Sequence, residues 1–208
     1  MKISKHLHSC LLIQEQDKTI LIDPGIFTYN AHALDLTKIN TLDYLLFTHE
    51  HPDHMHLPFV HEIVAKFPNV TIITNPSIVA LLEKENIKAG STTDAVVKLE
   101  NSPHEKLWDK MPPENVVIHL FNKLTHPGDS LHFEQTGDIL ALPLTAPWGS
   151  TTEAVTKAMS MKPRIIIPIH DFLWKDEIRM GMYERLTEFF KSHNIAFKGV
   201  ETGQVVEV

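Results

Sequence analysis

The segment "LLFTHEHPDHMHLP", residues 45–58, places four histidines and an aspartate directly after an apolar run. Residues two apart in an extended segment face the same way, so His49 and His51 can bind one metal ion. Beyond the bend at the proline, Asp53 and His54 can reach a second ion. A solvated histidine-rich loop is the alternative, but a His-x-His-x-Asp-His string rarely arises by chance. The segment therefore predicts half of a two-metal site at the end of a strand.

The composition is that of an ordinary globular protein, with 208 residues of which 43% are hydrophobic and 22% are charged. We expect a single domain over residues 1–208. The first apolar run, residues 10–13, is too short for a signal-peptide core or a membrane span, so we expect a cytoplasmic protein without a membrane partner. Cys10 is the only cysteine, which excludes an intrachain disulfide and favours a buried structural role.

The charge balance indicates the class of partner. The net charge is −7, and the sequence has no cluster of Lys and Arg of the kind that binds phosphate backbones. A nucleic-acid partner is therefore disfavoured, and a small-molecule substrate is the default expectation. Metal ions would add positive charge of their own, so an anionic substrate stays compatible with an acidic protein.

Hydrophobic periodicity predicts the elements and their order. Three strands, at residues 3–7, 10–14 and 19–22, form an antiparallel meander. From residue 44 onward strands and helices alternate. Strands are predicted at 44–48, 70–74, 95–99, 116–122, 139–144, 164–170 and 203–208, and helices at 57–67, 76–86, 151–161 and 176–193. Two mixed sheets with helices outside them, a four-layer α/β/β/α sandwich, is the economical packing, although periodicity alone also allows a three-layer α/β domain.

The order of several motifs resembles the metallo-β-lactamase superfamily. Besides the histidine string, the chain has the Asp-Pro-Gly turn at 23–25, the segment "LTHPGDSLHF" at 124–133 and the run "RIIIPIHDF" at 164–172. These segments look most like the small bacterial metal-dependent hydrolases related to ascorbate-6-phosphate lactonase. The resemblance extends over nearly the whole chain and implies an αββα fold.

The resemblance also implies a set of ligands. It assigns His49 and His51 to the first ion, and Asp53 and His54 to the second. Asp129 matches the carboxylate that bridges the two ions. The final ligand of the second ion corresponds to the histidine at position 170, His170, which ends a strand.

The third histidine of the first ion is the least determined ligand. His104 follows the predicted strand 95–99 in a loop, where the superfamily places this ligand, so we choose it. His119 lies inside a strand pattern. It is better interpreted as a core-facing histidine or as one that contacts a metal-ligand side chain. His126 is interpreted as a neighbour that orients Asp129. Either His119 or His126 could replace His104.

Other residues have lower-ranking roles. His8 corresponds to a histidine often near the site in this branch, so it could contact substrate or be a satisfied strand histidine. Trp148 could line the pocket or only pack beside its proline and glycine neighbours. Asp23 could hold the far nitrogen of a ligand histidine or cap a turn. His56 and His61 are expected to face solvent.

The ligand set implies a reaction type. In the superfamily, histidine at position 51 marks hydrolytic members, and an aspartate at position 129 accompanies two-metal chemistry. We expect two divalent ions that share a hydroxide, oriented by Asp53, and a small ester, lactone or phosphodiester substrate. Zinc suits the ligands best, and manganese or iron would also fit. The alternatives are a nucleic-acid phosphodiesterase of the same fold and a non-catalytic metal-binding sensor. The resemblance also allows a homo-oligomer.

Overall fold

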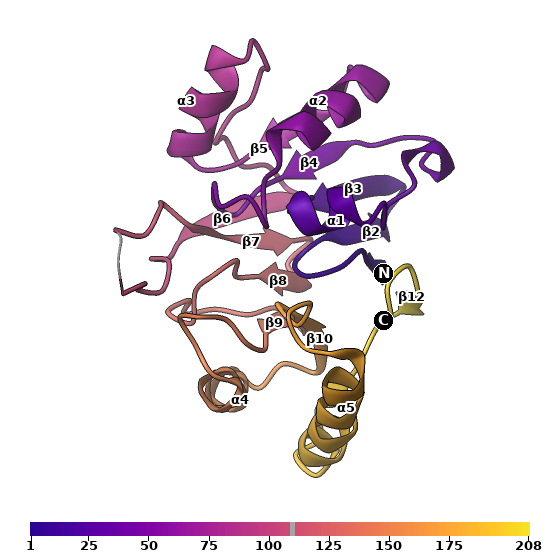
Figure 1. Cartoon of the computed structure of the whole chain (residues 1–208), viewed down its shortest axis with the longest axis vertical. Helices are drawn as coiled ribbons and strands as arrows, with labels where there is room; N and C mark the ends of the chain where they lie inside the picture. Colours follow the sequence, from indigo (N-terminus) through magenta and orange to yellow (C-terminus); the bar gives the residue numbers. More distant parts are fainter. Residues whose placement is uncertain (109–110) are drawn as a thin grey trace.

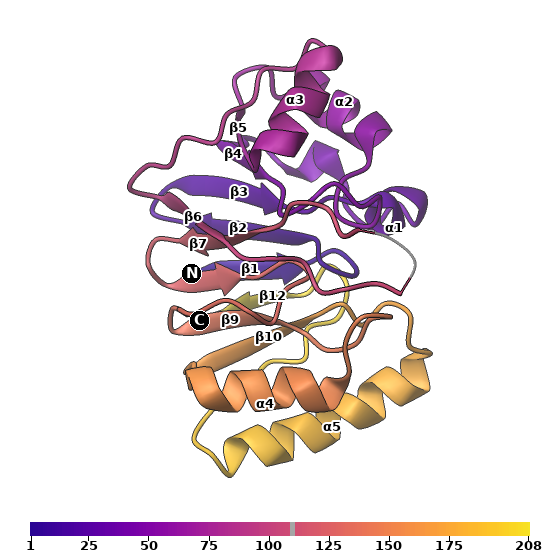
Figure 2. The same cartoon turned by 90° about the vertical axis from the view of Figure 1, so that its left-hand side faces the viewer.

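Two six-stranded sheets lie face to face in this computed structural model, which describes residues 1–108 and 111–208 (Figures 1 and 2). In spatial order, the first sheet contains β12 (Val205–Glu207), β1 (Lys2–Lys5), β2 (Leu11–Glu15), β3 (Lys18–Ile22), β4 (Tyr44–Leu46) and β5 (Thr71–Ile73). The second contains β11 (Ala196–Phe197), β10 (Ile165–Ile169), β9 (Ile139–Pro143), β8 (Leu124–His126), β7 (Val116–Leu120) and β6 (Val97–Asn101). Both sheets mix parallel and antiparallel pairs.

Helices cover the outer face of each sheet. Helices α2 (Leu57–Lys66) and α3 (Pro76–Lys84) pack on the first sheet, and α4 (Thr151–Met161) and α5 (Asp176–Lys191) pack on the second (Figure 2). A short helix α1 (Ile26–Asn30) and a 3₁₀ turn, η1 (Leu36–Lys38), follow β3. The predicted α/β/β/α sandwich is confirmed, and the three-layer alternative is wrong.

The alternation of side chains along the strands explains the layers. In β3, Ile20 and Ile22 face the core between the sheets, whereas Leu21 packs under the helices of the first sheet. In β10, Ile167 points into the same inter-sheet core and Ile166 packs under α4 and α5. Because both faces of each sheet are buried, these strands are apolar throughout rather than alternating with polar residues.

Side-chain caps start two of the predicted helices, α3 and α4. Helix α4 begins with a capping box in which the Ser150 hydroxyl accepts from the Glu153 N–H and the Glu153 carboxylate accepts from the Ser150 N–H. Asn75 caps α3 by accepting from the Ile78 N–H. Helix α4 begins at the predicted residue 151 because its capping box is a local signal, and it ends at the predicted residue 161, after which Lys162 adopts φ of 53°.

Several strands differ from the prediction. The first ends at Lys5 instead of residue 7, because Leu7 and His8 form a turn with φ of 67° and 47°. The strand predicted at 95–99 begins at residue 97, because the Asp94 carboxylate accepts from the N–H groups of Val96 and Val97. Strands β8 and β11, of three and two residues, were not predicted.

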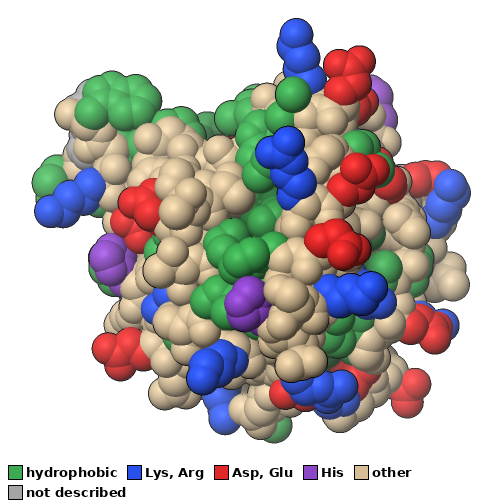
Figure 3. Space-filling model, turned by 90° about the horizontal axis from the view of Figure 1, so that it is seen from below, with side chains coloured by type: hydrophobic (Ala, Val, Ile, Leu, Met, Phe, Trp, Pro, Cys, Tyr) green, Lys and Arg blue, Asp and Glu red, His purple; other side chains and the backbone are tan. Residues whose placement is uncertain are grey.

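The surface and the single cysteine complete the description. Cys10 is buried, as predicted. Figure 3 views the molecule from the side of α4 and α5 and shows hydrophobic side chains in the middle of this face. Ile178, Met180 and Phe189 of α5 are exposed. Among residues 1–108 and 111–208, no helix has the length and apolarity needed to span a bilayer.

Candidate metal centre

Two groups of histidines and aspartates lie together where strands of both sheets end. The first cluster consists of His49, His51, His104 and Asp129, and the second of His8, Asp53, His54 and His170. Within each cluster one donor atom per residue lies within 4.8 Å of all the others. All seven predicted ligands are therefore brought together, and His8 joins them.

The three imidazoles of the first cluster turn ring nitrogens towards one another. Nδ1 of His51 lies 3.2 Å from Nε2 of His49 and 3.2 Å from Nε2 of His104. The other nitrogen of His104 donates to the Glu105 carbonyl at 2.6 Å, and Nδ1 of His49 lies 3.1 Å from the Thr48 hydroxyl. For His49 and His104 these partners assign the N–H proton to the outer nitrogen, which leaves a lone pair on the inner Nε2. Imidazole nitrogens that converge in this way are typical ligands of a metal ion, so the donor set fits one.

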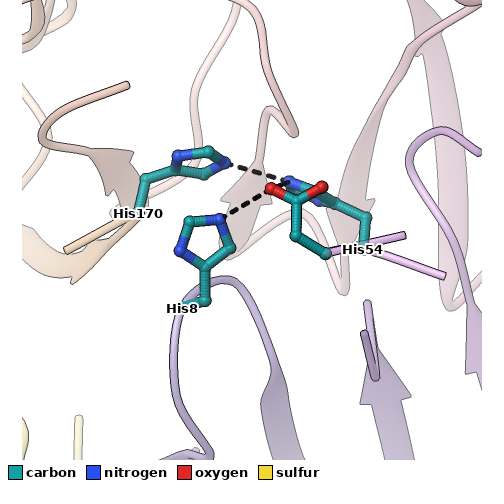
Figure 4. Close-up of side chains that lie close together, drawn as sticks. His8, His54 and His170 are labelled. Carbon is teal, nitrogen blue, oxygen red and sulfur yellow. Dashed lines mark hydrogen bonds and ion pairs between the residues drawn. The ribbon is translucent and has the colours of Figure 1, made fainter. Parts of the chain in front are cut away.

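The second cluster is oriented in the same way. Nδ1–H of His54 donates to the Asp23 carboxylate at 2.7 Å, and Nδ1–H of His170 donates to the Thr145 carbonyl at 3.2 Å. Their Nε2 atoms face each other at 3.0 Å. Although burial opposes it, the charges of Asp129 and Asp23 raise the pKa of His54, so a metal ion would replace a proton on this imidazole. Figure 4 shows the imidazoles of His8, His54 and His170 turned towards one point. Asp23 thus holds the far nitrogen of a predicted ligand, a common arrangement at metal sites.

Asp129 lies between the clusters and faces both. Its Oδ1 is 2.7 Å from Nε2 of His170 and 3.1 Å from Nε2 of His54. Its Oδ2 is 3.4 Å from Nε2 of His104 and 3.8 Å from Nε2 of His49. Oδ1 is buried and makes no hydrogen bond within the described residues. A buried carboxylate oxygen without a donor suits a cation, and the placement fits a bridging ligand.

The backbone and one indole fix the position of Asp129. Gly128 has φ of +59°, and a Cβ at this residue would lie 2.3 Å from Oδ1 of Asn115, so glycine is required. That same Asn115 oxygen accepts from the Asp129 N–H at 3.3 Å. Nε1–H of Trp148 donates to Oδ2 of Asp129 at 2.7 Å. The half-buried Trp148 therefore contacts the site directly, in addition to packing.

His8 enters the second cluster from the turn between β1 and β2. Its Nε2 lies 3.1 Å from Oδ2 of Asp53, and its ring centroid lies 3.8 Å from that of His170. Phe27 contacts the His8 ring edge-to-face at 5.1 Å. Burial, aided by the charge of His170, lowers the pKa of His8 to about 4. At neutral pH His8 is an uncharged donor that holds one oxygen of Asp53.

Electrostatics keep both carboxylates ionised. Burial alone would raise the pKa of Asp129, but the charges of His170 and His54 outweigh burial and hold that pKa well below its usual value. Burial opposes ionisation of Asp53 as well, and the hydrogen bond from His8 lowers the pKa of Asp53 below its usual value. Burial lowers the pKa of His49 strongly, so this imidazole is neutral, as a metal ligand must be.

Two histidines weighed for the first ion lie outside both clusters. His119 contacts the Thr125 hydroxyl and the Glu100 carboxylate, each at 3.0 Å. His126 is buried, and its Nε2 donates to the Ser9 carbonyl at 3.0 Å while its Nδ1 accepts from the Gly128 N–H at 3.3 Å. His126 therefore acts on the turn before Asp129 without contacting the carboxylate.

Sequence reasoning missed two residues that orient the site. The Thr48 hydroxyl donates to Asp23 at 2.6 Å and accepts from His49, so one side chain connects the two clusters. Asn115 makes hydrogen bonds with the backbone of the turn at residues 127–129. No sequence motif includes both Asn115 and this turn, so the contact was not predicted. His56 and His61 lie outside the clusters, with His61 3.4 Å from Glu85.

Comparisons with known proteins agree with this geometry. A family model described as "Beta-lactamase superfamily domain" matches residues 2–170, a range that includes both clusters. The chain belongs to the metallo-β-lactamase superfamily. Protein Rv0786c of Mycobacterium tuberculosis is 28% identical to this chain over 201 residues, which cover 90% of this chain and 92% of the relative. A UPF0173 metal-dependent hydrolase of Nanoarchaeum equitans is 27% identical, covering 84% and 85%.

Solved structures share the metallo-β-lactamase fold. Igni18, described as a novel metallo hydrolase from Ignicoccus hospitalis, superposes with a TM-score of 0.73 at 18% identity, covering 99% of this chain and 97% of that one. The metallo-beta-lactamase fold protein YhfI from Bacillus subtilis gives 0.67 at 15% identity, covering 99% and 98%. At these identities the likeness shows the fold alone.

Proposed function

We propose that the protein is a metal-dependent hydrolase that binds two divalent ions, one in each cluster. The observation that carries this proposal is the convergence of imidazole nitrogens on both sides of Asp129. The first ion would be held by His49, His51 and His104, and the second by Asp53, His54 and His170, with Asp129 shared. Related proteins named metal-dependent hydrolases support the same reading.

Two such ions would supply a water of lowered pKa as nucleophile and Lewis acids for the scissile bond. The chain's own residues supply orientation and proton transfer. Asp53 is ionised, has one oxygen held by His8 and is 28% exposed, so its carboxylate can accept a proton from a water in the site. Trp148 and His126 keep Asp129 and its turn in place.

The substrate class that we propose is a small ester, lactone or phosphodiester. Aromatic side chains border the second cluster. Phe27 contacts His8, and the ring centroid of Phe172 lies 4.6 Å from that of Phe27. The ring centroid of Trp148 lies 5.6 Å from that of His170. These half-buried rings can contact the apolar part of a small substrate. A lactone remains in this class because the chain resembles relatives of ascorbate-6-phosphate lactonase. We propose zinc as the metal, since it suits imidazole and carboxylate ligands.

Metal analysis combined with a substrate panel tests this proposal. The purified protein, loaded separately with zinc, manganese or iron, would be assayed on chromogenic phosphodiesters, esters, lactones and short RNA. We expect two ions per chain and turnover of a small substrate, which Asp53→Asn abolishes and Asp43→Asn leaves intact. Asp43 is the matched control because it binds Lys18 and the Thr19 N–H at the opposite end of β4. Turnover of RNA alone would favour a nuclease, and two bound ions without any turnover would favour a metal-binding sensor.

A further inference from the structure

A buried lysine pairs with the residue that follows His170 of the second cluster. Lys5, at the end of β1, is only 1% exposed, and its ammonium donates to the Asp171 carboxylate at 2.7 Å and to the Tyr183 hydroxyl at 2.8 Å. Tyr183, on α5, also donates to the same Asp171 oxygen. Burial raises the pKa of the Tyr183 hydroxyl, so it stays a donor. Lys5, Asp171 and Tyr183, hereafter the buried triad, thus satisfy one another away from water.

The buried triad joins the two sheets at the place where the second cluster forms. Lys5 belongs to the first sheet and precedes His8 by three residues. Asp171 follows His170, which comes directly after β10 of the second sheet. The His170 N–H also donates to the His8 carbonyl at 3.3 Å. The ion pair therefore connects the two chain segments that carry His8 and His170 from different sheets.

Both of these histidines have backbones that need such support. His8 has φ of 47° and His170 has φ of 59°, in the left-handed region that residues with a Cβ adopt only when surrounding contacts hold them there. Leu7, beside His8, also has a positive φ of 67°. Without the link between Lys5 and Asp171, relaxation of either turn would rotate an imidazole away from the second cluster.

Stability alone is a poor explanation for the buried triad. Removing two charges from water costs free energy that their attraction often fails to recover, so well-packed apolar groups are frequently as stabilising as a buried ion pair. A buried charged pair can instead select one arrangement of the segments that it joins. The triad also extends the site beyond the matched residues 2–170, because Asp171 and Tyr183 follow them.

We propose that Lys5, Asp171 and Tyr183 are positioning residues that set the geometry of the second metal site and couple helix α5 to it. The inference rests on the proposed two-metal function. It predicts that removal of the triad weakens one ion selectively, since outer partners of metal ligands typically change metal affinity 10–100-fold. The first cluster, whose imidazoles are held by Thr48 and Glu105, does not depend on it.

The test is a cobalt(II) titration of the metal-free protein, followed by absorbance and by competition with a chelator. The main variant is Lys5→Met/Asp171→Leu/Tyr183→Phe, which replaces all three polar partners together and leaves no unpaired buried charge. We expect one ion to bind with the parent affinity and the other about 10- to 100-fold more weakly. The matched control is Lys18→Met/Asp43→Asn, which removes a 2.8 Å ion pair remote from the clusters and should leave both affinities unchanged.

A second, conservative variant covers the case in which the triple variant does not fold. Tyr183→Phe keeps the ion pair and removes the hydroxyl, so it should weaken the same ion by a smaller factor and alter the same cobalt absorbance bands. Parent affinities for both ions in either folded variant would overturn the positioning role while the two-metal function stands. Equal weakening of both ions would also overturn it, because a general loss of structure acts on both clusters. A parent protein that binds no cobalt would overturn the proposed function itself, and the inference with it.

Discussion

Replacing Asp23 with asparagine should lower the affinity for one metal ion while the fold is retained. In the native protein, Oδ1 of Asp23 accepts from the Thr48 N–H at 2.8 Å, and Oδ2 accepts from the Thr48 hydroxyl at 2.6 Å and from Nδ1–H of His54 at 2.7 Å. An asparagine has one oxygen and one NH2 group, so its amide can be placed in two orientations. If the NH2 group replaces Oδ1, it faces the Thr48 N–H, and two donors are opposed. If the NH2 group replaces Oδ2, it faces His54, whose Nδ1 can accept a hydrogen bond only if its proton moves to Nε2.

The second orientation removes the lone pair that His54 presents to the second cluster. We expect the affinity for the second ion to fall about 10- to 100-fold, equivalent to about 1.4–2.7 kcal/mol. Loss of a buried hydrogen bond to a charged acceptor should also lower the free energy of unfolding of the metal-free protein by about 1.5–3 kcal/mol. The first ion should be affected less, because Asp23 reaches His49 only through Thr48.

Chelator competition on the zinc-loaded protein would measure the two affinities, and denaturant unfolding of the metal-free protein would measure stability. Asp43→Asn is the control, since Asp43 also accepts a backbone N–H and binds no residue of either cluster. Parent affinity for both ions in Asp23→Asn would refute the reasoning that Asp23 fixes the His54 tautomer. A loss of stability without a change in affinity would reduce Asp23 to a structural turn residue.

Three further outcomes follow from the geometry. His104→Ala should lower the affinity of the first ion more than about 100-fold, beyond the range for outer partners, whereas His119→Ala should not; chelator titration that ranks them the other way would exchange their roles. Trp148→Phe should weaken both ions about tenfold, because it removes the donor that orients Asp129; unchanged affinities would leave Trp148 with packing alone. In metal-free protein, the free energy of unfolding should fall as the pH drops from about 6.5 towards about 4, since the pKa of His8 is lowered to about 4 in the folded state and the unfolded chain takes up that proton first. A pH dependence in His8→Gln as steep as in the parent would contradict this.

Much of the fold was predictable because its signals are local. An apolar run such as Ile20, Leu21 and Ile22 depends on neighbours along the chain, and it correctly predicted a strand there. The capping box at Ser150 likewise determined where α4 starts. Where β1 ends and β6 begins away from the predicted residues, a backbone turn or a side-chain hydrogen bond is the cause. The Asp94 carboxylate, which accepts from the Val96 N–H before β6, is an example that hydrophobic periodicity does not reveal.

The amino-acid sequence by itself predicted a metal site at residues 49–54, because four closely spaced side chains of metal-ligand type are a local property of the chain. Only the tertiary structure decided that His104 faces this loop while His119 does not, and that His8 approaches Asp53. Both depend on how the ends of two sheets meet. The same holds for Lys5 and Asp171, which are 166 residues apart. A contact of that kind is produced by packing of the layers, and no pattern of spacing along the chain encodes it.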